Sequence, residues 1–384
     1  MRRSVAVAAA VLVLLGATPA AASAAEELPS VTGNDCVPGS PDTVTDVPWA
    51  QTWLQPERAW ELTDGRGVTV AVVDGGVGTP SSLSGGAVKQ SATDCSGHGT
   101  FLASLVAGRP VGEAAFSGVA PAATILNVEV ATGAYASGPP VAPPDELADG
   151  IRAAVSGGAG VVLLGAVSTG PSADLADAVR AAVRANVVVV SGVGTVRGSD
   201  SRLAESYPSA YDGVIGVAAM QLTGEVATFS AFSDDVDLAA PGVGVLGAAP
   251  KGPGHYVTDG TAVAAAFVAG TVALVRSYRP DLTVADVTER LRLTAAPTAQ
   301  RAALGYGVVN PAAAVGDELP ASAGRTSDAV TTVAVAPDRP PVTDHTAGLI
   351  AVAVAGTGLA AAALAAFAGV VVRRGRARRW RAPS

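Results

Sequence analysis

Between about Gly67 and Gly316, short apolar runs rich in valine alternate with alanine-rich segments of helical periodicity. These runs and segments are 68–73, 101–107, 123–130, 147–155, 160–166, 175–184, 187–191 and 214–219. Strands separated by helices pair in parallel through right-handed crossovers. The alternation therefore predicts an α/β domain over residues 65–316 with three layers, α/β/α, around a mostly parallel central sheet.

The first 25 residues have the layout of a secretory signal peptide. Two arginines precede an apolar run at 5–15, and a small-residue stretch follows at 20–25. Residues 26–64 hold three of the four tryptophans, which indicates an N-terminal extension that packs on the domain. Trp53, Leu54 and Trp60, at helix-compatible spacing, are its expected anchors.

The C-terminal end has a different composition. Residues 317–347 are rich in Pro, Thr and Ala without apolar periodicity, as in an extended linker. Residues 348–372 carry no charge and are long enough to span a bilayer, and 373–384 contain six arginines. By the positive-inside rule this pattern predicts one transmembrane helix, with the domain outside and the basic tail in the cytoplasm. The alternative is a buried core helix followed by a solvated tail.

Charge and cysteine content narrow the class of partner and the compartment. The formal net charge of −8 becomes −16 for the exported part, because eight of the 25 Lys and Arg lie in the signal and the tail, leaving 17 against 33 acidic residues. Nucleic acid is thereby disfavoured as a partner. Cys36 and Cys95 both lie in the exported region, where thiols oxidise in pairs, so one disulfide is expected; two free thiols are the alternative. The sequence shows no cluster of His, Cys and carboxylates at ligand spacing, so neither a metal nor another cofactor is predicted.

In an open parallel sheet, functional groups gather at the carboxyl ends of strands. The run 68–73 ends in Asp74, and two glycines follow it. Alone, such an aspartate is more typical of a turn, but it can also orient and stabilise an imidazolium. His98 precedes the apolar segment 101–107, and a histidine at a helix start can act as a general base. Their joint presence favours a catalytic pair.

Three segments together resemble the subtilisin-like family, the subtilases, whose triad runs Asp, His, Ser along the chain. They are the strand ending in Asp74, the motif Ser-Gly-His-Gly-Thr at 96–100, and the segment Gly-Thr-Ala-Val-Ala-Ala-Ala-Phe-Val-Ala-Gly at 260–270. Further family landmarks are at 118–128, 207–211, 229–233, 236–242 and 305–310, so that the resemblance covers about 48–315.

Features outside the domain narrow the resemblance. The signal, the early cysteine, the stretch Pro-Trp-Ala-Gln at 48–51 and the tail anchor are similar to the mycosin branch, the membrane-anchored subtilases of the actinobacterial type VII secretion system. The resemblance implies a subtilisin-like fold. It also implies partners among the subunits of the type VII secretion membrane complex.

The chain departs from the family pattern at the chemistry. Ala262 stands at the nucleophile position, so the serine is absent, and Thr195 replaces the asparagine that stabilises the oxyanion. Leu-Leu-Gly at 163–165 stands where the family has Asn-x-Ser leading into the substrate-binding strand. Ala266 replaces a proline inside the serine motif. Loss at several positions indicates natural decay of the catalytic site.

The sequence leaves three candidate functions open. The leading prediction is a catalytically inactive pseudoprotease with a structural or regulatory role in the secretion complex, its cleft empty or holding a peptide. The second is an active membrane-anchored serine endopeptidase with a non-standard nucleophile, for which Thr261, Ser168 and Ser191 are the candidate hydroxyls and poor substitutes. The third is an extracellular peptide-binding module unconnected with secretion.

Overall fold

The computed structural model describes residues 25–30, 35–131, 140–194, 206–230, 233–319 and Arg374. Residues up to Arg325 form one compact unit, and residues from Thr326 form a second, in which only Arg374 is described. Almost all of the predicted signal, most of the linker and the predicted span 348–372 lie outside the described residues. Thr195 does too.

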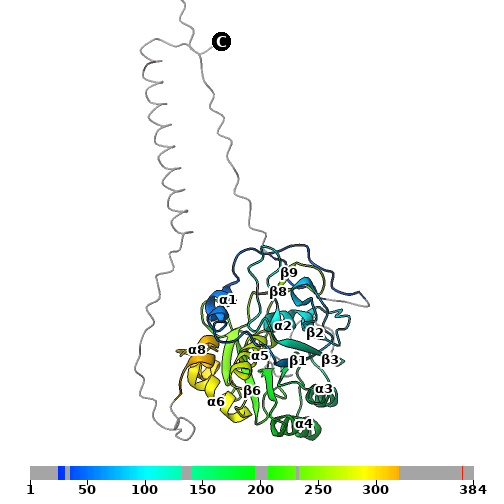
Figure 1. The fold of residues 1–384 in the computed structure, drawn as a ribbon, viewed down its shortest axis with the longest axis vertical. Coiled ribbons are helices and arrows are strands. Elements are labelled where there is room, and N and C mark those ends of the chain that lie inside the picture. Colours follow the sequence, from blue (N-terminus) through cyan, green and yellow to red (C-terminus); the bar gives the residue numbers. More distant parts are fainter. Residues whose placement is uncertain are drawn as a thin grey trace, which may run out of the picture. The chain divides into compact units, whose positions relative to one another are not determined.

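Seven strands, all paired in parallel, form the central sheet (Figure 1). In the order β2-β3-β1-β4-β5-β6-β7 they are Val88–Lys89, Thr124–Glu129, Thr69–Asp74, Val161–Leu164, Val188–Gly192, Val214–Met220 and Leu238–Pro241. A separate antiparallel pair consists of β8 (Val245–Ala248) and β9 (His255–Thr258). The predicted α/β fold with a mostly parallel sheet is confirmed.

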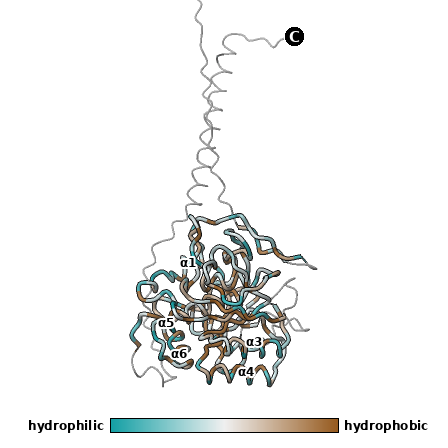
Figure 2. Tube along the Cα trace, turned by 45° about the vertical axis from the view of Figure 1, so that its right-hand side comes forward, coloured by the Kyte–Doolittle hydropathy of each residue, from teal (hydrophilic) through white to brown (hydrophobic). Residues whose placement is uncertain are grey.

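Side chains of β1 alternate between two hydrophobic cores, as the two-residue period of a strand requires. Val70 and Val72 belong to the core shared with α2 (His98–Ala107) and α5 (Thr261–Tyr278). Ala71 and Val73 belong to the other core, beneath α3 (Pro144–Ser156) and α4 (Ala173–Arg184). Figure 1 shows α3 and α4 together on one side of the sheet, and in Figure 2 the hydrophobic segments concentrate inside the domain.

Helix α5 runs through the middle of its core. Every residue from Thr261 to Arg276 is buried. Within the described part of the chain, α5 is the one helix long and apolar enough to cross a membrane, but its burial identifies it as the core helix of the domain. The remaining helices are α1 (Trp49–Leu54), η1 (Pro56–Arg58), η2 (Ser81–Leu83), α6 (Val284–Thr294), α7 (Arg301–Leu304) and α8 (Pro311–Gly316).

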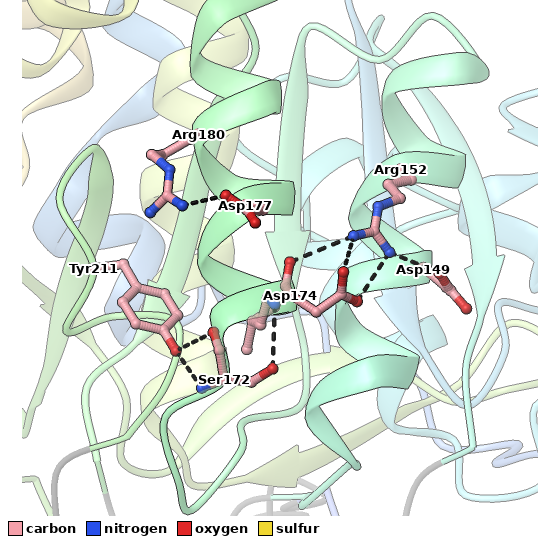
Figure 3. A network of polar contacts seen from close by, with 8 residues as sticks. Asp149, Arg152, Ser172, Asp174, Asp177, Arg180 and Tyr211 are labelled. Atoms are coloured by element: carbon pink, nitrogen blue, oxygen red, sulfur yellow. Dashed lines mark hydrogen bonds and ion pairs between the residues drawn. The ribbon is translucent and has the colours of Figure 1, made fainter.

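Polar contacts join the two helices of the α3–α4 layer at its surface (Figure 3). Arg152 of α3 contacts Asp149 at 2.9 Å and Asp174 of α4 at 3.1 Å. Its hydrogen bond lowers the pKa of Asp174. At the start of α4, the Tyr211 hydroxyl accepts from the Ser172 N–H at 2.7 Å and donates to the Ser172 carbonyl at 3.0 Å. The exposed Arg152 contacts join α3 to α4, and the part-buried Tyr211 contacts hold the start of α4.

The N-terminal extension packs on the domain through its tryptophans. In α1, the Trp49 indole donates to the Gly244 carbonyl at 3.0 Å, and the ring of Trp53 meets that of Trp49 edge-on. The helix ends at Leu54, because Gln55 is left-handed (φ 47°) and Pro56 follows. Trp60 therefore does not share a helix with Trp53, contrary to the expected spacing; its indole donates to the Val119 carbonyl at 2.9 Å.

Candidate active site

The structure brings Asp74 and His98 together. Asp74 is the last residue of β1 and is fully buried, and His98 is the first residue of α2. The Nδ1 atom of His98 lies 2.8 Å from Oδ2 of Asp74. The other carboxylate oxygen, Oδ1, accepts from the Gly75 N–H at 2.7 Å. An aspartate in this position can fix the tautomer of the imidazole and stabilise its charged form.

A second buried carboxylate, Asp94, holds the start of α2 in place. Its Oδ1 accepts from Ser96 Oγ and the Gly97 N–H, each at 2.8 Å. Its Oδ2 accepts from the N–H and the hydroxyl of Thr100, each at 2.7 Å. Burial, and then the nearby charge of Asp74, raise the pKa of Asp94 above its ordinary value, against the opposite effect of the hydrogen bonds from Thr100 and Ser96. Asp94 thus satisfies N–H groups that the first turn of a helix leaves without partners.

Asp74 rests against a strand that has no side chain at the contact. A Cβ atom added to Gly165, just after β4, would lie 1.8 Å from Oδ2 of Asp74. The sequence resemblance places Gly165 at the serine position of the family's Asn-x-Ser. A serine could not be accommodated there unless the carboxylate moved. The sequence departure at 163–165 and the position of Asp74 are therefore linked.

Ala262, which the sequence resemblance places at the nucleophile position, lies at the beginning of α5. Ala262 is the second residue of the helix and is 5% exposed. Its methyl group has no oxygen to attack a carbonyl, and no proton for His98 to accept.

The three residues predicted as possible substitute nucleophiles, Thr261, Ser191 and Ser168, are all buried. A Cβ atom added to Gly192 of β5 would lie 2.5 Å from Thr261 Oγ1, so that the Thr261 hydroxyl packs against β5. Ser191 is fully buried, with its hydroxyl 3.3 Å from the Gly192 carbonyl. The hydroxyl of Ser168 donates to the Gly170 carbonyl at 3.1 Å. The Ser191 and Ser168 hydroxyls thus face main-chain carbonyl groups.

Cys36 and Cys95 are joined by a disulfide. The Val37 N–H also donates to the Cys95 carbonyl at 2.8 Å. Cys95 directly follows Asp94, so that the extension is fastened to the segment that leads into His98. Among the described residues, no three His, Cys, Asp or Glu side chains lie together in a way that could hold a metal ion.

Sequence reasoning did not identify Asp94 as a site residue, and it singled out Gly165 only as part of the departure from the family at 163–165. Asp94 had one usable signal, a carboxylate four residues before a helix start, although capping residues usually stand closer. For Gly165, no sequence signal indicated the contact with Asp74. The contact of Gly165 with Asp74 depends on the parallel register of β1 and β4, which places Val73 opposite Leu164.

The sequence and fold of this chain match those of known proteins. The Peptidase_S8 (subtilase) family matches residues 65–307, which is most of the chain. The chain therefore belongs to the subtilase family. Among its relatives, it is 30% identical to Mycosin-1 of Mycobacterium tuberculosis, over 96% of this chain and 98% of that protein.

Solved structures of type VII secretion proteins are also similar to this chain. The MycP3 protease from the type VII (ESX-3) secretion system is 29% identical, covers 77% of this chain and 96% of its own, and superposes with a TM-score of 0.65. A chain of the periplasmic assembly from the ESX-5 inner membrane complex is 26% identical and covers 82% of this chain and 94% of its own, with a TM-score of 0.64. The chain is thus a mycosin-like subtilase, related to proteases of type VII secretion.

Proposed function

We propose that this chain is a catalytically silent mycosin-like protein with a structural or regulatory role in a type VII secretion membrane complex. One observation carries the proposal. The buried Asp74–His98 pair, 2.8 Å apart, is combined with a methyl group at Ala262, where a serine hydroxyl would stand. A triad without its nucleophile cannot form an acyl-enzyme.

The expected loss of activity is large. In subtilisin, removal of the serine lowers turnover by about 10⁶-fold. Removal of one oxyanion donor costs about 10²–10³-fold where it acts independently. Ala262 and Thr195 stand in place of the serine and of the asparagine that donates to the oxyanion. With both contributions absent, we expect no useful turnover.

Partners and location are part of the same proposal. The relationship to a chain of the ESX-5 periplasmic assembly supports partners within an equivalent membrane complex. The uncharged run 348–372, followed by six arginines, supports a single span with the acidic domain outside the cell membrane and the tail inside. A role outside the active site is consistent with a domain that keeps its core while losing its chemistry.

Active-site labelling tests catalytic silence. A fluorophosphonate probe reacts with activated serines, so we expect no labelling of the purified full chain under conditions in which a working subtilase is labelled completely. Labelling at any serine of this chain would establish a non-standard nucleophile instead.

Two further measurements test place and partners. Protease added to spheroplasts should remove the domain and spare a tag placed after Ser384; the reverse pattern contradicts the topology. Affinity purification from detergent-solubilised membranes should recover secretion-channel subunits. If it recovers none, an isolated extracellular module becomes the better account.

A further inference from the structure

Two extended segments of the chain run into the candidate site. One is residues 166–169, which follow Gly165 and correspond to the family's substrate-binding strand. The other is β9, which precedes the segment Asp259 to Ala262. An extended peptide binds to such segments by adding a strand to a free edge, where main-chain hydrogen bonds supply affinity. Whether the main-chain groups along these edges are already hydrogen-bonded therefore decides whether the cleft can hold a peptide.

One edge of the segment 166–169 is taken by residues 140–142. The Val167 N–H donates to the Pro140 carbonyl at 3.0 Å, and the Ala142 N–H donates to the Val167 carbonyl at 3.0 Å. Val141 and Val167 form a parallel bridge. Ala142 and Val167 are both buried.

The opposite edge is taken by Tyr207. The Ser168 N–H donates to the Tyr207 carbonyl at 2.8 Å, and the Tyr207 N–H donates to the Ser168 carbonyl at 3.0 Å. Because successive residues of a strand direct their main-chain groups to opposite edges, these four bonds use both edges at Val167 and Ser168.

The β9 segment is occupied in the same way. Strand β8 covers one edge, with Leu246 opposite Val257. On the other edge, the Val257 N–H donates to the Glu26 carbonyl and the Leu28 N–H donates to the Val257 carbonyl, both at 2.8 Å. Leu28 also reaches the histidine side of the site, since a Cβ atom added to Gly97 would lie 3.1 Å from Leu28 Cδ1.

We propose that the chain occupies its own peptide groove: residues 140–142 and 26–28 make the main-chain hydrogen bonds that a bound peptide would make. This inference rests on the proposed silent function and deepens it, because it decides between an empty cleft and one that holds a foreign peptide. An incoming strand would first have to break two hydrogen bonds at either segment and would only replace them. The exchange brings little net stabilisation.

Hydrogen exchange of the full chain, in detergent, tests the pairing directly. We expect the amides of Ala142, Val167, Ser168 and Val257 to exchange at least about 100-fold more slowly than in an unfolded chain. A large excess of a blocked, extended Ala-Val hexapeptide should leave these rates unchanged. Exchange at unprotected rates, or added protection from the hexapeptide, would overturn the proposal.

A matched pair of proline substitutions sharpens the test. Ala142→Pro removes the N–H that donates to Val167, whereas the N–H of Val141 makes no hydrogen bond in the described part of the chain, so Val141→Pro serves as the control. We expect the Val167 amide to exchange at least about 10-fold faster in Ala142→Pro only. Fluorescein-labelled hexapeptide should give an anisotropy change with Ala142→Pro and none with the unmodified chain. Equal peptide binding by both would contradict self-occupation.

The other groove segment gives a second route if Ala142→Pro fails to fold. Leu28→Gly removes the side chain that packs beside Gly97, and should speed exchange of the Val257 amide without changing that of Ser168. Equal rates at Val257 before and after the substitution would refute the role of residues 26–28. Failure here remains separate from failure of the silent function, which is decided by fluorophosphonate labelling of the unmodified chain.

Discussion

The Asp74–His98 pair is polar, buried and hydrogen-bonded, whereas the position of Ala262 is apolar and lies on a helix whose neighbouring residues are all buried. Loss of either partner of the pair removes a hydrogen bond from a buried polar or charged group, which is costly for folding. Loss of the serine exchanges a hydroxyl for a methyl in an apolar helix and costs the fold little. Stability of the fold alone would therefore favour retention of Asp74 and His98.

The sharpest test of this comparison is His98→Ala. Fully buried Asp74 would lose the imidazole that faces its Oδ2 and keep the Gly75 N–H at its Oδ1, so we expect the free energy of unfolding to fall by about 3–5 kcal/mol, as when one member of a buried pair is removed. Ala262→Ser, in the other half, should change it by at most about 1 kcal/mol. Urea denaturation of both variants measures the contrast. Similar losses would show that the two halves matter equally to the fold.

Restoring chemistry to the nucleophile half should require more than one change. Ala262→Ser leaves the oxyanion without its asparagine, so we expect Ala262→Ser with Thr195→Asn to exceed Ala262→Ser alone by about 10²–10³-fold. A small ester such as p-nitrophenyl acetate is the suitable substrate, because it does not need the peptide groove. Equally fast hydrolysis by Ala262→Ser alone would show that only the serine had been lost.

Gly165 belongs to the departure from the family at 163–165, and it contacts Asp74 of the aspartate–histidine pair. Gly165→Ala places a methyl group where Oδ2 of Asp74 lies, and overpacking of this kind should lower the free energy of unfolding by about 1–3 kcal/mol. Gly160→Ala is the matched control, since the nearest atom to its added Cβ is Val68 Cγ1 at 3.8 Å. If denaturant midpoints of the two variants agree, Asp74 is free to move aside.

Local sequence signals located the aspartate–histidine half well. An apolar run that ends in Asp74 and a Gly-His-Gly motif ahead of an apolar segment are short-range patterns, and the structure places them at the end of β1 and the start of α2. The parallel sheet followed from the alternation of element types. These features depend on residues that are near each other in the chain.

Other features depend on partners that residue type does not encode. The bonds between Val167 and residues 140–142, and between Val257 and Glu26, join main-chain groups that every residue carries. Which segments meet is decided by the path of the chain, so neither pairing had a sequence signal. The left-handed Gln55 that ends α1 before Trp60 is a local exception, foreshadowed only by Pro56.

The smallest predicted effect is a dependence of the free energy of unfolding on pH, through a histidine in β9, the strand that precedes Ala262. His255 of β9 is buried against the Phe116 ring, and its Nδ1 lies 3.4 Å from the Val44 N–H of the extension. Burial lowers the pKa of His255 below its ordinary value of 6.5. As pH falls through 6.5, the unfolded chain therefore binds a proton before the folded chain does. The free energy of unfolding should decrease until the pH passes the folded pKa.

Comparison of the unmodified chain with His255→Phe isolates this contribution from that of the other histidines. Phenylalanine keeps the aromatic contact with Phe116 and cannot be protonated, so the decrease in unfolding free energy between pH 7.5 and 5.5 should be smaller in the variant. Urea denaturation at the two pH values measures the difference. An equal or larger decrease in His255→Phe would mean that the β9 side is insensitive to pH. The acid response of the domain would then have to come from the aspartate–histidine half.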